Sequence, residues 1–112
     1  MENLTWETKG TALLAKYVGE ITMEVTGGFK QEVERALGEA TVMVLDLSEV
    51  SFMDSSGIGF LVACNTRMQS AGKTLVLFEP STQVRKTLGL VQLMSYFQVA
   101  DSQADLDTLL GA

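Results

Sequence analysis

Residues 41–78 read TVMVLDLSEVSFMDSSGIGFLVACNTRMQSAGKTLVLF, and this stretch is the most informative about the fold. Its two ends, Thr41–Leu47 and Thr74–Phe78, are apolar on both faces, which is typical of parallel strands that are covered on both sides. The segment Ser56–Ala71 between them is long enough for a helix, and Gly72 is placed to end it. Strand, helix and strand in this order predict a right-handed parallel crossover and therefore an α/β domain.

The sequence before this stretch predicts a β-hairpin and a helix. Leu4–Lys9 and Leu14–Val18 alternate apolar and polar residues, so each suits a half-buried strand, the first at the edge of the sheet. Gly10-Thr11 between them suits a tight turn. A helical stripe runs over Val25–Leu37, capped by one of two threonines and stopped by a glycine, and Gly27-Gly28 in its first turn predicts a late or loose start.

The sequence after residue 80 predicts three further elements. Ser81–Leu88 suits a short helix with two buried aliphatic side chains, and Tyr96–Val99 suits a short last strand. A terminal helix follows from Asp101 or Ser102, either of which can cap it. We therefore expect a single domain over residues 1–112, with a mixed, mostly parallel sheet of four or five strands and about four helices.

Composition excludes several classes of function. The chain has 112 residues, a net charge of −6 and eight scattered basic residues, which argues against nucleic-acid binding. No run approaches the ~20 apolar residues of a membrane span, and the N-terminus lacks a secretory pattern. The chain is expected to be cytoplasmic, without direct membrane binding.

The absence of histidine removes the usual metal ligand and general base, and one cysteine forbids an internal disulfide. Cys64 lies among apolar residues and is interpreted as a buried thiol. We expect no metal, no cofactor and no catalytic residue.

The candidate functional residues lie at the start of the central helix, where the hydrogen-bonding side chains of Asp54, Ser55 and Ser56 follow one another. One side chain suffices to cap the free amides there, and Ser56 is the expected cap. Gly57 and Gly59 leave room for another backbone or for a protein to approach. A phosphoryl group on Ser55 would face the positive end of the helix dipole, with Asp54 beside the hydroxyl. On these residues alone, a plain helix start is the simpler interpretation.

The segment Leu45–Gly59, with its Asp-Ser-Ser-Gly core, resembles the signature of the STAS domain family, most closely the bacterial anti-sigma factor antagonists. The resemblance extends over nearly the whole chain, from Gly19-Glu20 to the terminal helix. It implies that Ser55 is the phosphoacceptor within a switch loop formed by the neighbouring residues. It also implies a partner contact on two segments, made by Glu20, Ile21, Thr22, Met53 and Ile58. Ile21-Thr22 stands where the antagonists usually carry Leu-Asp.

The resemblance further implies a set of partners. The unphosphorylated antagonist binds a histidine-kinase-like ATPase that is both an anti-sigma factor and a serine kinase, and so frees a sigma factor. Phosphorylation on Ser55 releases the antagonist, and a PP2C-type phosphatase restores it. The kinase supplies ATP and metal, so this chain needs neither.

Two other classes of function remain open from the sequence. STAS domains also occur as small cytosolic subunits of ABC lipid transporters, where the same surface binds the ATPase subunit without phosphorylation. An enzyme with a serine nucleophile would need a base, and the candidate lysines, Lys30, Lys73 and Lys86, share no motif with Ser55.

Overall fold

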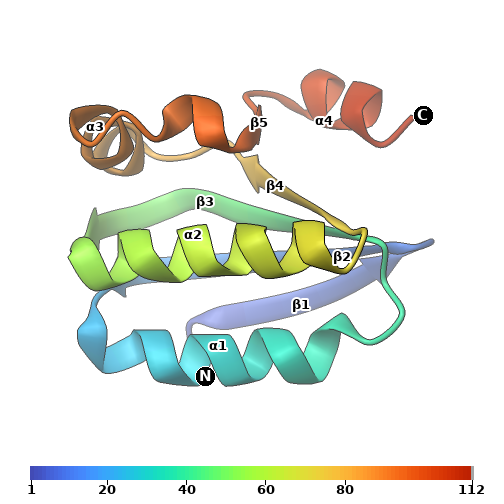
Figure 1. Ribbon diagram of the computed structural model, residues 1–112, viewed down its shortest axis with the longest axis horizontal. Helices are drawn as coiled ribbons and strands as arrows, with labels where there is room; N and C mark the ends of the chain where they lie inside the picture. The colour runs from blue at the N-terminus through green and yellow to red at the C-terminus, as the bar shows by residue number, and fades with distance from the viewer. Residues whose placement is uncertain (112) are drawn as a thin grey trace.

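The computed structural model describes residues 1–111, and within them five strands form one sheet in the order β1-β2-β3-β4-β5 (Figure 1). The strands are β1 Leu4–Lys9, β2 Ala12–Ile21, β3 Val42–Met53, β4 Thr74–Phe78 and β5 Gln98–Ala100. The helices are α1 Met23–Leu37, α2 Ser55–Ser70, α3 Thr82–Leu90, the 3-10 helix η1 Met94–Tyr96 and α4 Gln103–Leu109.

The sheet has the mixed topology predicted from the sequence. β1 pairs antiparallel with β2 at one edge, and β2, β3, β4 and β5 are parallel to their neighbours. The register Leu13–Met43–Leu75 aligns buried residues of the three central strands. The prediction of an α/β domain built on a β3-α2-β4 crossover is confirmed.

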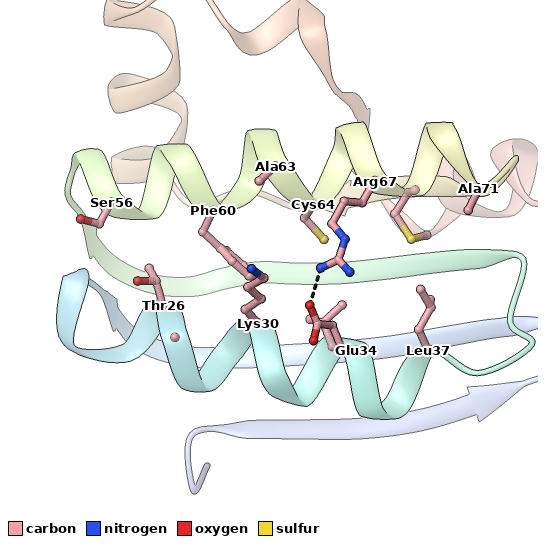
Figure 2. A pocket seen from close by; sticks show the side chains of 13 residues that line it. Thr26, Lys30, Glu34, Leu37, Ser56, Phe60, Ala63, Cys64, Arg67 and Ala71 are labelled. Carbon is pink, nitrogen blue, oxygen red and sulfur yellow. Dashed lines mark hydrogen bonds and ion pairs between the residues drawn. The ribbon is translucent and has the colours of Figure 1, made fainter.

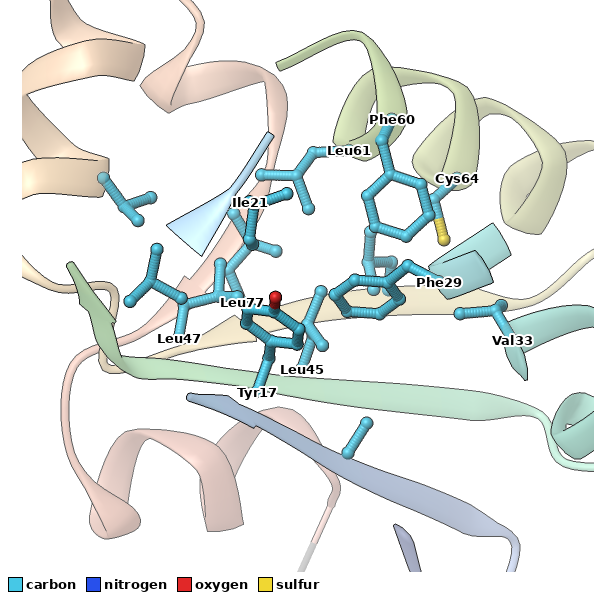
Figure 3. Close-up of a cluster of buried hydrophobic side chains, with 14 of the residues drawn as sticks. Tyr17, Ile21, Phe29, Val33, Leu45, Leu47, Phe60, Leu61, Cys64 and Leu77 are labelled. Carbon is cyan, nitrogen blue, oxygen red and sulfur yellow. The ribbon is translucent and has the colours of Figure 1, made fainter. Parts of the chain in front are cut away.

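Helices cover both faces of the sheet. α1 and α2 lie side by side and pack on the central strands (Figure 1). By contrast, α4 packs through Leu106 against Val44 and Val76. The main core lies between the sheet, α1 and α2, where three aromatic rings meet (Figure 3). Phe29 stacks on Tyr17 with ring centroids 5.1 Å apart and contacts Phe60 at 4.5 Å. This stack joins β2 to both helices.

The structure corrects the predicted start of α1. The helix begins at Met23 rather than late, and Gly27 and Gly28 lie within it. Each glycine costs about 1 kcal/mol relative to alanine in a helix interior. Burial of Phe29 in the aromatic stack holds the turn in spite of that cost. Gly38 ends α1 with a φ of 48°, as predicted.

The last strand also differs from the prediction. Tyr96, predicted to start this strand, instead ends the 3-10 helix Met94–Tyr96, and β5 runs over Gln98–Ala100. The turn is held by Asn65 of α2, whose Nδ2 donates to the Tyr96 carbonyl at 3.3 Å. Asn65 is 3% exposed, although no pattern in the sequence predicts its burial.

Candidate functional site

The predicted switch segment lies where β2 and β3 end and two helices begin. The strand ends pair side by side, Ile21 with Met53, and the Asp54 N–H donates to the Ile21 carbonyl at 3.2 Å. α1 begins two residues after Ile21, and α2 begins directly after Asp54. Both helix N-termini, with their free amides, therefore lie at this end of the sheet.

Asp54, and not Ser56, caps α2. Its backbone is extended (φ −94°, ψ −174°), and its Oδ1 accepts from the Gly57 N–H at 3.1 Å. Its Oδ2 accepts from the Met23 N–H in the first turn of α1 at 3.2 Å. One carboxylate thus fastens the entrances of both helices. The prediction of Ser56 as cap was wrong because the helix begins at Ser55, two residues earlier than a cap at Ser56 implies, which places Ser56 in the second helical position.

Ser55 is the first residue of α2, and it is exposed. Within residues 1–111 its hydroxyl takes part in no hydrogen bond, because the neighbouring Asp54 is the residue that caps the helix. A group transferred to this oxygen would lie in solvent beside the positive end of the helix dipole.

The two glycines of the segment have different structural reasons. A Cβ on Gly57 would lie 2.8 Å from the Ile21 carbonyl oxygen and would collide with the Met53 side chain. Gly57 therefore allows α2 to start against the ends of β2 and β3. A Cβ on Gly59 would meet nothing within 4 Å, so Gly59 leaves an open surface.

The five residues predicted to contact a partner differ in how far their side chains are exposed. Glu20 is exposed, and Thr22 and Ile58 are half-buried, so all three have side-chain surface at this end of the molecule. Ile21 and Met53 are only 0% and 2% exposed and belong to the core. Their predicted role as direct contacts is therefore corrected: they support the segment from beneath.

Two exposed apolar side chains beside the segment were not predicted from the sequence. Met23, at the start of α1, is 72% exposed, and Phe52, opposite Glu20 in the β2–β3 register, is 42% exposed. Strand alternation could have indicated Phe52, because its neighbour Met53 faces the core. Such residues beside a polar serine provide the apolar contact area that protein interfaces use.

The remaining candidates for a reactive group, Cys64 and Lys73, are buried or hydrogen-bonded elsewhere in the fold. Cys64 is buried, and burial raises the pKa of its thiol to about 11. Lys73, one of the possible bases, donates to the Gly38 carbonyl at 2.9 Å. Among residues 1–111 no cluster of acidic, cysteine or histidine side chains is arranged to hold a metal ion, and none of the helices described there is long and apolar enough to cross a membrane.

The chain is thus a small α/β domain in which an exposed serine opens the helix that follows the central strand of a mixed sheet. Residues 3–106 match the model of the STAS domain. The chain belongs to the STAS domain family.

Known proteins resemble the chain over nearly its whole length. It is 24% identical to an anti-sigma F factor antagonist of Lysinibacillus sphaericus, covering 99% of this chain and 93% of that protein. The unphosphorylated structure of the anti-sigma factor antagonist SpoIIAA matches with a TM-score of 0.80 at 21% identity, covering 97% of both chains. The phosphorylated form of SpoIIAA from Bacillus matches with a TM-score of 0.72 at 20% identity, covering 95% of this chain and 98% of that one. At this identity, the structural likeness shows the fold.

Proposed function

We propose that this protein is an anti-sigma factor antagonist controlled by phosphorylation on Ser55. In its unphosphorylated form it binds a histidine-kinase-like ATPase that sequesters a sigma factor, and the phosphorylated form is released. The observation that carries the proposal is Ser55 itself, which is exposed at the first position of α2 and whose hydroxyl has no hydrogen-bond partner among residues 1–111. The name of the Lysinibacillus relative supports the regulatory class.

The site suits a switch in which the fold stays unchanged and the partner is exchanged. A phosphoserine adds about −1.5 to −2 charge units near neutral pH. The helix dipole and free amides at the start of α2 can bear this charge, since anions at a helix N-terminus are favourable by about 0.3–1 kcal/mol. Asp54 already uses both carboxylate oxygens to hold the two helices, so it need not move.

Phosphorylation is expected instead to weaken the binding of the partner. Exposed Met23 and Phe52 offer apolar contact area around Ser55, and Glu20 adds a negative charge. A surface that covers these residues would have to desolvate the phosphate. A penalty of about 2–3 kcal/mol would weaken the complex roughly 30- to 150-fold, which is enough to exchange partners.

The test is an affinity pull-down from the native host with wild-type, Ser55→Ala and Ser55→Asp proteins as baits, followed by mass spectrometry. We expect the alanine variant to retain a histidine-kinase-like ATPase and the aspartate variant to lose it. Ser70→Asp is the matched control, because it places the same charge at the far end of α2.

Two results would contradict the proposal. Equal affinity of all four baits for the same ATPase would make Ser55 a structural residue only. Recovery of ABC-transporter subunits by every bait would instead assign the chain to lipid transport. A PP2C-type phosphatase that removes phosphate from Ser55 would complete the cycle and can be assayed on the phosphorylated chain.

A further inference from the structure

A groove separates α1 from α2 on the surface of the molecule (Figure 2). It has a volume of about 540 Å³, within the range of roughly 300–1,000 Å³ in which small-molecule sites occur. Small residues leave it open, because Gly27, Ala63 and Ala71 line it where larger side chains would fill the space. A Cβ on Gly27 would meet no atom within 4 Å.

The floor of the groove is apolar. Val33 from α1 and Phe60, Cys64 and Met68 from α2 line it, and all four side chains belong to the main core. The raised pKa of Cys64 keeps its thiol neutral near pH 7, so this wall carries no charge. The groove runs from Thr26 to Leu37 along α1, which is roughly 16 Å at 1.5 Å per residue. That shape accommodates a slender apolar chain.

The rim of the groove is positively charged. Arg67 of α2 forms an ion pair with Glu34 of α1 across the opening (Figure 2). Lys30, one turn before Glu34, is exposed and takes part in no ion pair within residues 1–111. Two cations and one anion leave a charge of +1 at this opening, on a chain whose net charge is −6. The local excess is complementary to a monoanion.

We propose that the α1–α2 groove binds a medium-chain fatty carboxylate, with its alkyl chain on the apolar floor and its carboxylate at Lys30 and Arg67. The unpaired Lys30 and the charge of +1 favour this ligand over a neutral lipid or a cationic amphiphile. The inference does not depend on phosphorylation of Ser55.

Decanoate is the probe, titrated into the full chain labelled with ¹⁵N and followed by two-dimensional NMR. We expect saturable shifts confined to amides of α1 and α2 that line the groove. Decanol and decyltrimethylammonium serve as neutral and cationic probes of equal chain length, and both are expected to bind at least threefold more weakly. Lys30→Gln should weaken decanoate binding about threefold to tenfold, whereas Lys86→Gln on α3 should leave it unchanged.

A matched pair of variants tests the location. Gly27→Leu places a side chain in the groove and is expected to abolish binding, whereas Gly28→Leu, one residue on and outside the lining, should preserve it. Both substitutions replace glycine by a better helix former, so the fold is expected to persist. Ala63→Leu blocks the groove independently from α2 if Gly27→Leu does not fold.

Several outcomes would overturn the proposal. They are the absence of saturable shifts, equal binding of decanol and decanoate, and full binding by both blocking variants. A concentration-dependent dimer with the same shifts in the absence of decanoate would assign the groove to a second copy of the chain instead.

Discussion

At the scale of single residues, Gly57 and Gly59 look alike in the sequence but meet different surroundings. The first is buried against the Ile21 carbonyl oxygen, 2.8 Å from where a Cβ would lie, and the second has open space. We expect Gly57→Ala to lower the free energy of unfolding by about 1–3 kcal/mol through overpacking. Gly59→Ala should raise it by about 0.5–1 kcal/mol, because alanine favours a helix interior.

Urea unfolding followed by circular dichroism measures both variants, each as the control of the other. A Gly57→Ala protein as stable as Gly59→Ala would show that the close contact at the start of α2 does not exist in solution.

Cys64 makes a pH-dependent contribution to stability. Burial raises the pKa of its thiol from 9.0 to about 11, so the folded state holds the proton more tightly than the unfolded state. The contribution of Cys64 to the free energy of unfolding is therefore fully present below pH 9 and is lost as the pH rises from about 9 to about 11. Two pKa units correspond to about 2–3 kcal/mol.

The free energy of unfolding of the wild type should therefore fall more steeply above pH 9 than that of Cys64→Ala. Chemical denaturation at several pH values under reducing conditions provides the measurement. Parallel pH profiles for the two proteins would contradict burial of the thiol.

At the scale of elements, α1 depends on its neighbours. It contains two adjacent glycines, and Phe29 directly after them is buried on Tyr17 and Phe60. A helix of 15 residues is marginal in isolation even with good helix formers. A peptide of residues 22–38 should therefore be mostly non-helical in water by circular dichroism.

The matched peptide with Gly27→Ala and Gly28→Ala should be measurably more helical, since each change favours the helix by about 1 kcal/mol. A strongly helical native peptide would show that α1 is set by local propensity, contrary to the role we assign to the aromatic stack.

At the scale of the whole molecule, phosphorylation is expected to change the surface and not the fold. The phosphate would add to a net charge of −6, but it would lie at an exposed helix entrance, away from the core. A dipole contribution of about 0.3–1 kcal/mol would shift Tm by no more than several °C. Circular dichroism and calorimetry of the protein phosphorylated on Ser55 test this expectation. A markedly lower Tm would contradict the dipole argument and point to a switch by unfolding.

Sequence patterns are sufficient to predict the architecture. Thr41–Leu47 and Thr74–Phe78 are apolar on both faces, which only strands covered on both sides require, and the helix between them implied their parallel pairing. Ser102, one of the two residues predicted to cap the terminal helix, caps α4, and Ser81, the first residue of the predicted helix Ser81–Leu88, caps α3. Local hydrogen bonding and periodicity suffice for features of this kind.

The tertiary structure alone decided which residues of the site are free to act. Asp54 became the cap because its carboxylate also reaches the first turn of α1, a contact between residues 31 positions apart. Ile21 and Met53 became core because the ends of β2 and β3 pair beneath Gly57. The groove exists because α1 and α2 pack side by side with small residues from each helix, Gly27 and Ala63, in its lining. The cap, the buried strand ends and the groove each depend on contacts between segments that are far apart in the sequence, and a local sequence pattern does not predict such contacts.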